Sequence, residues 1–96
     1  MTDKQFEEQI KQTVSKYLPS SDYRIFLFGS RAIYKNYKWS DMDIGILGDK
    51  AIPGHIIVKI QDELENSRIP YKIDLVDFTR VSDQFRKVAM KNCINL

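Results

Sequence analysis

Three short apolar runs, separated by segments with helical periodicity, constrain the fold of this 96-residue chain more than any other feature. Each run has the length and composition of a buried β-strand; the runs are residues 23–28, 42–47 and 71–76. Apolar residues recur at helical spacing before the first run and after the second and third. Strands that alternate with helices favour an α/β domain over a helical bundle or an all-β fold. We therefore predict a small sheet with helices packed on it.

Local start and stop signals bound the helices. The first helix ends at Pro19, and the second begins at Pro53 and ends before Pro70. Ser82 caps the last helix, whose inner face we expect to be Phe85, Val88, Ala89 and Cys93. Residues 30–39 have room for a short helix. About a dozen residues connect the first two strands, which suits a parallel or an antiparallel pair, so the strand order stays open.

Length and composition limit what the chain can be. Ninety-six residues are too few for two independent cores, so we expect a single domain over residues 1–96. A net charge of +2 is too small to indicate direct nucleic-acid binding. One cysteine excludes an internal disulfide and a cysteine-based metal cluster. The longest apolar run is too short for a membrane span, and no secretory signal is visible, so we expect a cytoplasmic protein without membrane contact.

The second predicted strand carries two carboxylates on one face. Side chains alternate across a strand, so Asp41, Asp43 and Gly45 share a face, and the apolar residues between them take the other. The two carboxylates then lie roughly 7 Å apart along the strand, and they repel each other unless a cation lies between them. Mg²⁺ suits such a pair because it usually binds one or two carboxylates plus substrate phosphates. Gly45 is expected to leave room for a ligand to approach the sheet.

The other two predicted strands add a carboxylate and a glycine turn. Asp74 lies in the middle of an otherwise apolar strand, where an unused charge is unexpected; Asp77 ends that strand on the opposite face and ranks below it. Three carboxylates on neighbouring strands can hold two metal ions for an in-line phosphoryl displacement. Gly29 ends the first strand, so the N–H groups that follow can face an anion, with Ser30 and Arg31 placed to hold terminal phosphates.

Taken together, these residues resemble the signature of a known superfamily. The segments that carry it are Gly29-Ser30-Arg31-Ala32, Ser40-Asp41-Met42-Asp43-Ile44 and Ile73-Asp74-Leu75-Val76. They are similar to the motifs of the DNA polymerase beta-like nucleotidyltransferases, and in particular of the smallest branch, the minimal nucleotidyltransferases (MNT). The resemblance covers residues 23–77 and implies the palm fold of that superfamily, with a small mixed sheet.

The resemblance also implies an activity, which is transfer of AMP from ATP to an acceptor hydroxyl with release of pyrophosphate. Asp41 and Asp43 would bind two Mg²⁺ ions and the triphosphate. Asp74 would complete the second metal site and help to deprotonate the acceptor hydroxyl.

Further roles and a partner follow from the same resemblance. Gly29 and Ser30 would bind the β- and γ-phosphates, and Arg31 matches the motif. Members of the MNT branch are commonly encoded beside a HEPN-domain ribonuclease toxin and act as its antitoxin, some by adenylylating it. The resemblance thus implies a protein acceptor and a hetero-oligomer with a HEPN-domain protein.

Two other functions stay open. The MNT branch often continues its motif with Arg-Gly, where this chain has Ile33-Tyr34. That difference motivates a non-catalytic antitoxin, which would neutralise its partner by docking and keep a vestigial nucleotide site. A nucleotidyltransferase that modifies a small molecule is a weaker alternative, because 96 residues leave little chain for an acceptor pocket.

Overall fold

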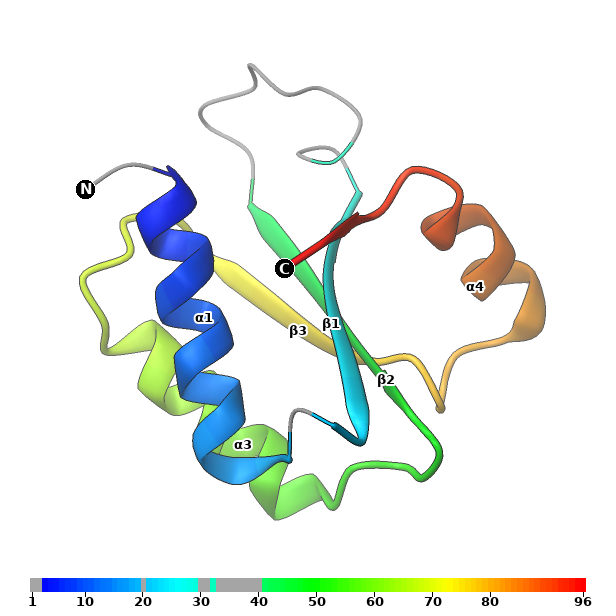
Figure 1. The fold of residues 1–96 in the computed structure, drawn as a ribbon, viewed down its shortest axis with the longest axis horizontal. Coiled ribbons are helices and arrows are strands. Elements are labelled where there is room, and N and C mark those ends of the chain that lie inside the picture. Colours follow the sequence, from blue (N-terminus) through cyan, green and yellow to red (C-terminus); the bar gives the residue numbers. More distant parts are fainter. Residues whose placement is uncertain (1–2, 20, 30–31, 33–40) are drawn as a thin grey trace.

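The computed structural model describes residues 3–19, 21–29, 32 and 41–96, and these follow the predicted alternation (Figure 1). The helices are α1 (Asp3–Tyr17), α3 (Gly54–Glu65) and α4 (Asp83–Met90). The strands are β1 (Tyr23–Phe28), β2 (Met42–Gly48), β3 (Ile73–Asp77) and β4 (Ile94–Asn95). The three predicted strands are confirmed, whereas β4 is not among the predicted elements. The short helix expected within residues 30–39 falls outside the described residues, except for Ala32.

The four described strands form one mixed sheet in the order β3-β2-β1-β4. β1 pairs antiparallel with both β2 and β4, whereas β2 pairs parallel with β3. The sheet therefore brings the end of β1 and the beginnings of β2 and β3 to one edge. That edge holds Gly29, Asp41, Asp43 and Asp74.

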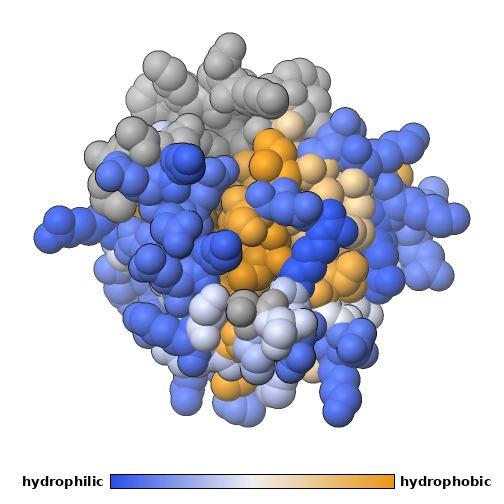
Figure 2. Space-filling model, viewed as in Figure 1, coloured by the Kyte–Doolittle hydropathy of each residue, from blue (hydrophilic) through white to orange (hydrophobic). Residues whose placement is uncertain are grey.

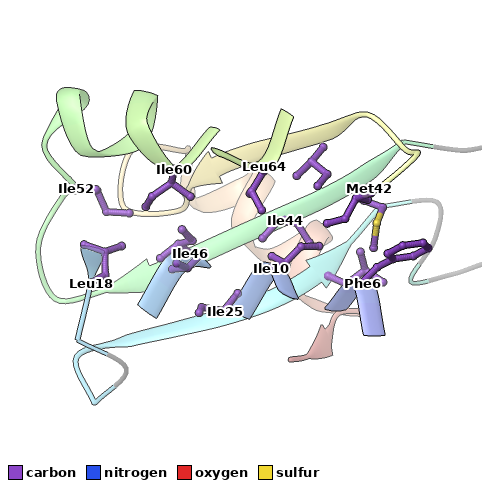
Figure 3. Close-up of a cluster of buried hydrophobic side chains, with 14 residues drawn as sticks. Phe6, Ile10, Leu18, Ile25, Met42, Ile44, Ile46, Ile52, Ile60 and Leu64 are labelled. Atoms are coloured by element: carbon purple, nitrogen blue, oxygen red, sulfur yellow. The ribbon is translucent and has the colours of Figure 1, made fainter. Parts of the chain in front are cut away.

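One face of the sheet carries the main hydrophobic core, which α1 and α3 cover (Figure 1). Figure 3 shows its 14 side chains, in which residues of α1 and α3 meet alternate residues of β1 and β2. The set is Phe6, Ile10, Val14, Leu18, Ile25, Leu27, Met42, Ile44, Ile46, Ile52, Ile60, Leu64, Ile69 and Ile73. Burying one aliphatic side chain contributes roughly 1.5–3 kcal/mol, so this face is the main source of stability.

The opposite face carries a smaller aromatic core of Phe26, Phe28 and Phe78, on which α4 lies. A Cβ at Gly45 would lie 2.5 Å from the Phe26 ring and 2.7 Å from the Phe78 ring. The prediction that Gly45 leaves room for a ligand is therefore wrong. Because Gly45 has no side chain, the rings of Phe26 and Phe78 occupy that space instead.

The rotation of α4 also differs from the prediction. Ser82 caps the helix as expected, because its Oγ accepts a hydrogen bond from the Phe85 N–H. The Arg86 side chain donates to the Phe78 carbonyl oxygen at 2.7 Å, which turns the Arg86 side of the helix toward the sheet. Ala89 and Cys93 pack on the aromatic core as expected, but Phe85 is 44% exposed and Val88 is 68% exposed. Val88 is thus wrongly predicted as an inner residue.

The outer edge of β3 is covered by a side chain rather than by a strand. Gln61 of α3 donates through Nε2 to the Ile73 carbonyl oxygen at 2.6 Å, and its Oε1 accepts from the Leu75 N–H at 3.2 Å. The amide group therefore occupies the backbone groups with which another strand would pair.

The surface is hydrophilic over most of the view in Figure 2, with apolar surface at the centre between α1 and α4. β1 and β4 cross that region in Figure 1. The large apolar side chains that are exposed among the described residues are Val58, Phe85 and Val88. Among the described residues, no helix has both the length and the apolar character that a membrane span requires.

Candidate active site

The sheet register brings the predicted carboxylates together at one edge. Asp43 of β2 is the register partner of Asp74 in β3 and of Phe28 in β1. Register partners point to the same face of a sheet, so both carboxylates lie on the aromatic face with Phe28. Asp41 directly precedes β2 and is exposed.

Two of the carboxylates act electrostatically on the third. Partial burial raises the pKa of the Asp43 carboxyl above its ordinary value, and the negative charges of Asp74 and then Asp41 raise it further. Asp43 therefore lies at the centre of an acidic group, where its ionised form is disfavoured. A cation at this edge would relieve the repulsion.

Gly29 follows the last residue of β1 and lies close to the Asp43 carboxylate. Its φ of +73° is a left-handed conformation that residues with a Cβ rarely adopt. A Cβ at this position would also overlap Oδ2 of Asp43. The Ala32 N–H donates to the Gly29 carbonyl oxygen at 3.1 Å, so the chain turns directly after the strand. The phosphate-binding role predicted for this glycine stays a prediction, and its closeness to the Asp43 carboxylate has no signal in the sequence.

Two of the predicted phosphate ligands, Ser30 and Arg31, lie outside the described residues. The structure thus places Gly29 and Asp74 beside Asp43, with Asp41 two positions before it in the chain.

The donor set fits a metal ion that is shared with a substrate. No three His, Cys, Asp or Glu side chains among the described residues are close enough to hold a metal ion by themselves. Mg²⁺ usually completes its coordination with water and substrate phosphates. Hard carboxylate oxygens that repel one another fit that mode of binding.

Asp77 lies away from this group and has a structural role. Its carboxylate accepts hydrogen bonds from the Ile52 N–H at 2.8 Å and from the Thr79 N–H and hydroxyl at 3.0 and 2.7 Å. It also pairs with Arg80 at 3.3 Å. Burial opposes ionisation, but these donors and the Arg80 charge outweigh it and lower the Asp77 pKa. Its lower rank as a site carboxylate agrees with this placement.

Known proteins are similar to this chain in sequence and in fold. The family described as "Polymerase beta, Nucleotidyltransferase" matches residues 8–96. The Haemophilus influenzae "Probable protein adenylyltransferase MntA" is 28% identical over 82 residues, which are 85% of this chain and 70% of the relative.

Solved structures agree on the fold. A chain in the complex of tri-AMPylated Shewanella oneidensis HEPN toxin with MNT antitoxin superposes with a TM-score of 0.75 at 19% identity, over 98% of this chain and 71% of that one. A chain of a toxin-antitoxin with AMP-PNP also gives a TM-score of 0.75, at 21% identity, over 93% of this chain and 70% of that one. The predicted mixed α/β fold is confirmed.

Proposed function

This chain belongs to the polymerase beta nucleotidyltransferase family, and we propose that it transfers AMP from ATP to a hydroxyl group of a protein. The observation that carries the proposal is the acidic group of Asp41, Asp43 and Asp74, gathered on one sheet edge beside the Gly29 turn. The likeness to a probable protein adenylyltransferase and to a complex with an AMPylated toxin supports AMP as the transferred group and a protein as the acceptor.

In this proposal the acceptor oxygen attacks the α-phosphorus of ATP, the bond from that phosphorus to the bridging oxygen breaks, and pyrophosphate leaves. Asp74 takes the proton of the acceptor hydroxyl, since it lies beside Asp43 at the same edge. Asp41 and Asp43 would hold Mg²⁺, which when bound neutralises charge on the phosphates. Backbone N–H groups of the turn after Gly29, together with Ser30 and Arg31, orient the β- and γ-phosphates.

We further propose that residues 1–96 act as one nucleotidyltransferase domain and that the acceptor is a HEPN-domain protein, bound in a hetero-oligomer. The complex of an MNT antitoxin with a HEPN toxin supports this partner. Use of ATP and a single free cysteine fit a cytoplasmic setting.

The test is transfer of label from α-labelled ATP, with Mg²⁺, to proteins in a lysate of the source organism. The wild type is compared with an Asp41→Asn, Asp43→Asn variant and with an Asp49→Asn, Asp62→Asn control. The control makes the same change of charge at exposed positions outside the acidic group. We expect wild type and control to label a protein and the site variant to lose at least about 100-fold in rate.

Two outcomes would contradict the proposal. Labelling that is equal in the site variant would show that the two aspartates do not carry the reaction. A folded wild type that labels nothing would favour the docking antitoxin, and the motif difference at Ile33-Tyr34 would then mark a vestigial site.

A further inference from the structure

The acidic group and α4 share one face of the sheet. Phe28 is the register partner of Asp43, and its ring lies 5.0 Å from the Phe78 ring and 6.2 Å from the Phe85 ring of α4, between centroids. α1 and α3 cover the other face (Figure 1). A protein that presents a hydroxyl to Asp74 on this face approaches the side of the sheet that carries α4.

This helix, α4, is less buried than α1 and α3. α4 buries none of its residues, whereas α1 and α3 both contribute to the main core. Phe85 and Val88, with 44% and 68% of their surface exposed, are three positions apart and thus neighbours on the helix surface. Phe85 is also held by its contacts with Phe28 and Phe78, so little conformational entropy is lost when a partner covers it.

Cations border this apolar pair. Lys87 and Lys91 are exposed, and neither has an ion-pair partner among residues 3–19, 21–29, 32 and 41–96. Lys91 is the C-cap residue directly after α4, and four positions separate it from Lys87, so the two lie on the same side of the helix end. A charged rim around an apolar centre is a common composition of protein interfaces, in which the rim selects partners by charge.

We propose that this α4 surface, made of Phe85, Val88, Lys87 and Lys91, docks the protein acceptor, a role that rests on the proposed function. The matching surface of the acceptor is apolar at its centre and carries carboxylates at its rim. Docking there brings a hydroxyl of the acceptor to the acidic group on the same face of the sheet.

The chain supplies a matched pair of variants for the test. Val88→Glu adds a carboxylate to the docking surface, and Val58→Glu adds the same group to α3 at a position that is 64% exposed. The probe is the purified protein that the wild type labels. The measurements are kcat and KM for that protein, KM for ATP, the melting temperature and the oligomeric state of the isolated chain.

We expect Val88→Glu to raise the KM for the acceptor at least tenfold, which is about 1.4 kcal/mol, with the KM for ATP unchanged. Val58→Glu should stay within about twofold of the wild type. A Lys87→Glu, Lys91→Glu variant should also raise the acceptor KM, and it keeps the test decisive if Val88→Glu folds poorly.

Equal acceptor KM values for Val88→Glu and Val58→Glu would overturn the docking role while leaving the proposed transfer intact. Loss of self-association in Val88→Glu, with an unchanged acceptor KM, would assign the surface to a second copy of this chain and also overturn it. A folded wild type that labels no protein refutes the proposed function itself, and the docking role falls with it.

Discussion

Replacing Gly29 by alanine tests the geometry of the acidic group more sharply than removal of a carboxylate. The substitution changes no charge and adds one methyl group. It does so at a residue whose φ is +73° and whose added Cβ would overlap Oδ2 of Asp43. Both the turn and the Asp43 side chain must then adjust.

The expected cost follows from these two effects. A left-handed conformation costs a residue with a Cβ roughly 1–2 kcal/mol, and a displaced Asp43 rotamer adds about 0.5–1.5 kcal/mol. The reduced entropy of the unfolded chain offsets about 0.4–1 kcal/mol. The Gly29→Ala variant should therefore lose about 0.5–3 kcal/mol of stability, at roughly 4–8 °C in melting temperature per kcal/mol.

The assay combines thermal unfolding with the rate of AMP transfer. Displacing Asp43 should slow transfer by about 100-fold, because such chemistry depends on positions within an ångström. Gly54→Ala is the matched control, since no atom lies within 4 Å of its added Cβ. It should be more stable than wild type by about 0.4–1 kcal/mol and equally active. A Gly29→Ala variant with wild-type melting and transfer would refute the assigned role of this glycine.

Three further predictions concern charge and the sheet edge. Because the pKa of Asp43 is raised, its ionised form destabilises the fold, so Asp43→Asn should have a higher melting temperature than wild type at pH 7 and should lose AMP transfer. Melting temperatures measured against pH should show this gain fading below the ordinary pKa of 3.8, where the side chain at position 43 is neutral in both proteins. The pKa of Asp77 is lowered, so its ionised form stabilises the fold above the ordinary pKa, and this contribution is lost as pH falls through the lower folded value. Urea unfolding of Asp77→Asn at pH 7 should therefore show a loss of about 1–3 kcal/mol, and the loss should shrink in acid. Gln61→Leu frees the edge of β3, so it should lose about 1–2 kcal/mol and form aggregates detected by light scattering at concentrations where wild type stays monodisperse.

The sequence predicts β1, β2 and β3 because each is a short, mostly apolar run with the length of a buried strand. The two carboxylate faces follow from the alternation of side chains along a strand, and Asp43 does meet Asp74. β4 has no such signal, since its two residues become a strand only by pairing with Phe26 and Leu27. The strand order is likewise a tertiary property, because the loop between β1 and β2 suits either direction.

Residues whose environment is set by distant contacts are harder to predict. The apolar spacing in α4 suggested that Val88 faces inward, but the hydrogen bond from Arg86 to Phe78 turns it outward. Gly45 suggested an open approach to the sheet, but rings from β1 and from the residue after β3 fill the space. The local sequence pattern predicts the face of the sheet or helix on which a side chain lies, but it does not predict which distant residues pack against that side chain.

The two faces of the sheet contribute differently to stability. One face buries the 14-residue core under α1 and α3, where most substitutions lower stability. The other face carries the acidic group at its edge and a helix without a buried residue. Since selection removes variants that fall below a stability threshold, the outer surface of α4 is free to diverge at little cost in folding. In the proposed docking role, this surface can change to fit another acceptor while the core and the acidic group stay as they are.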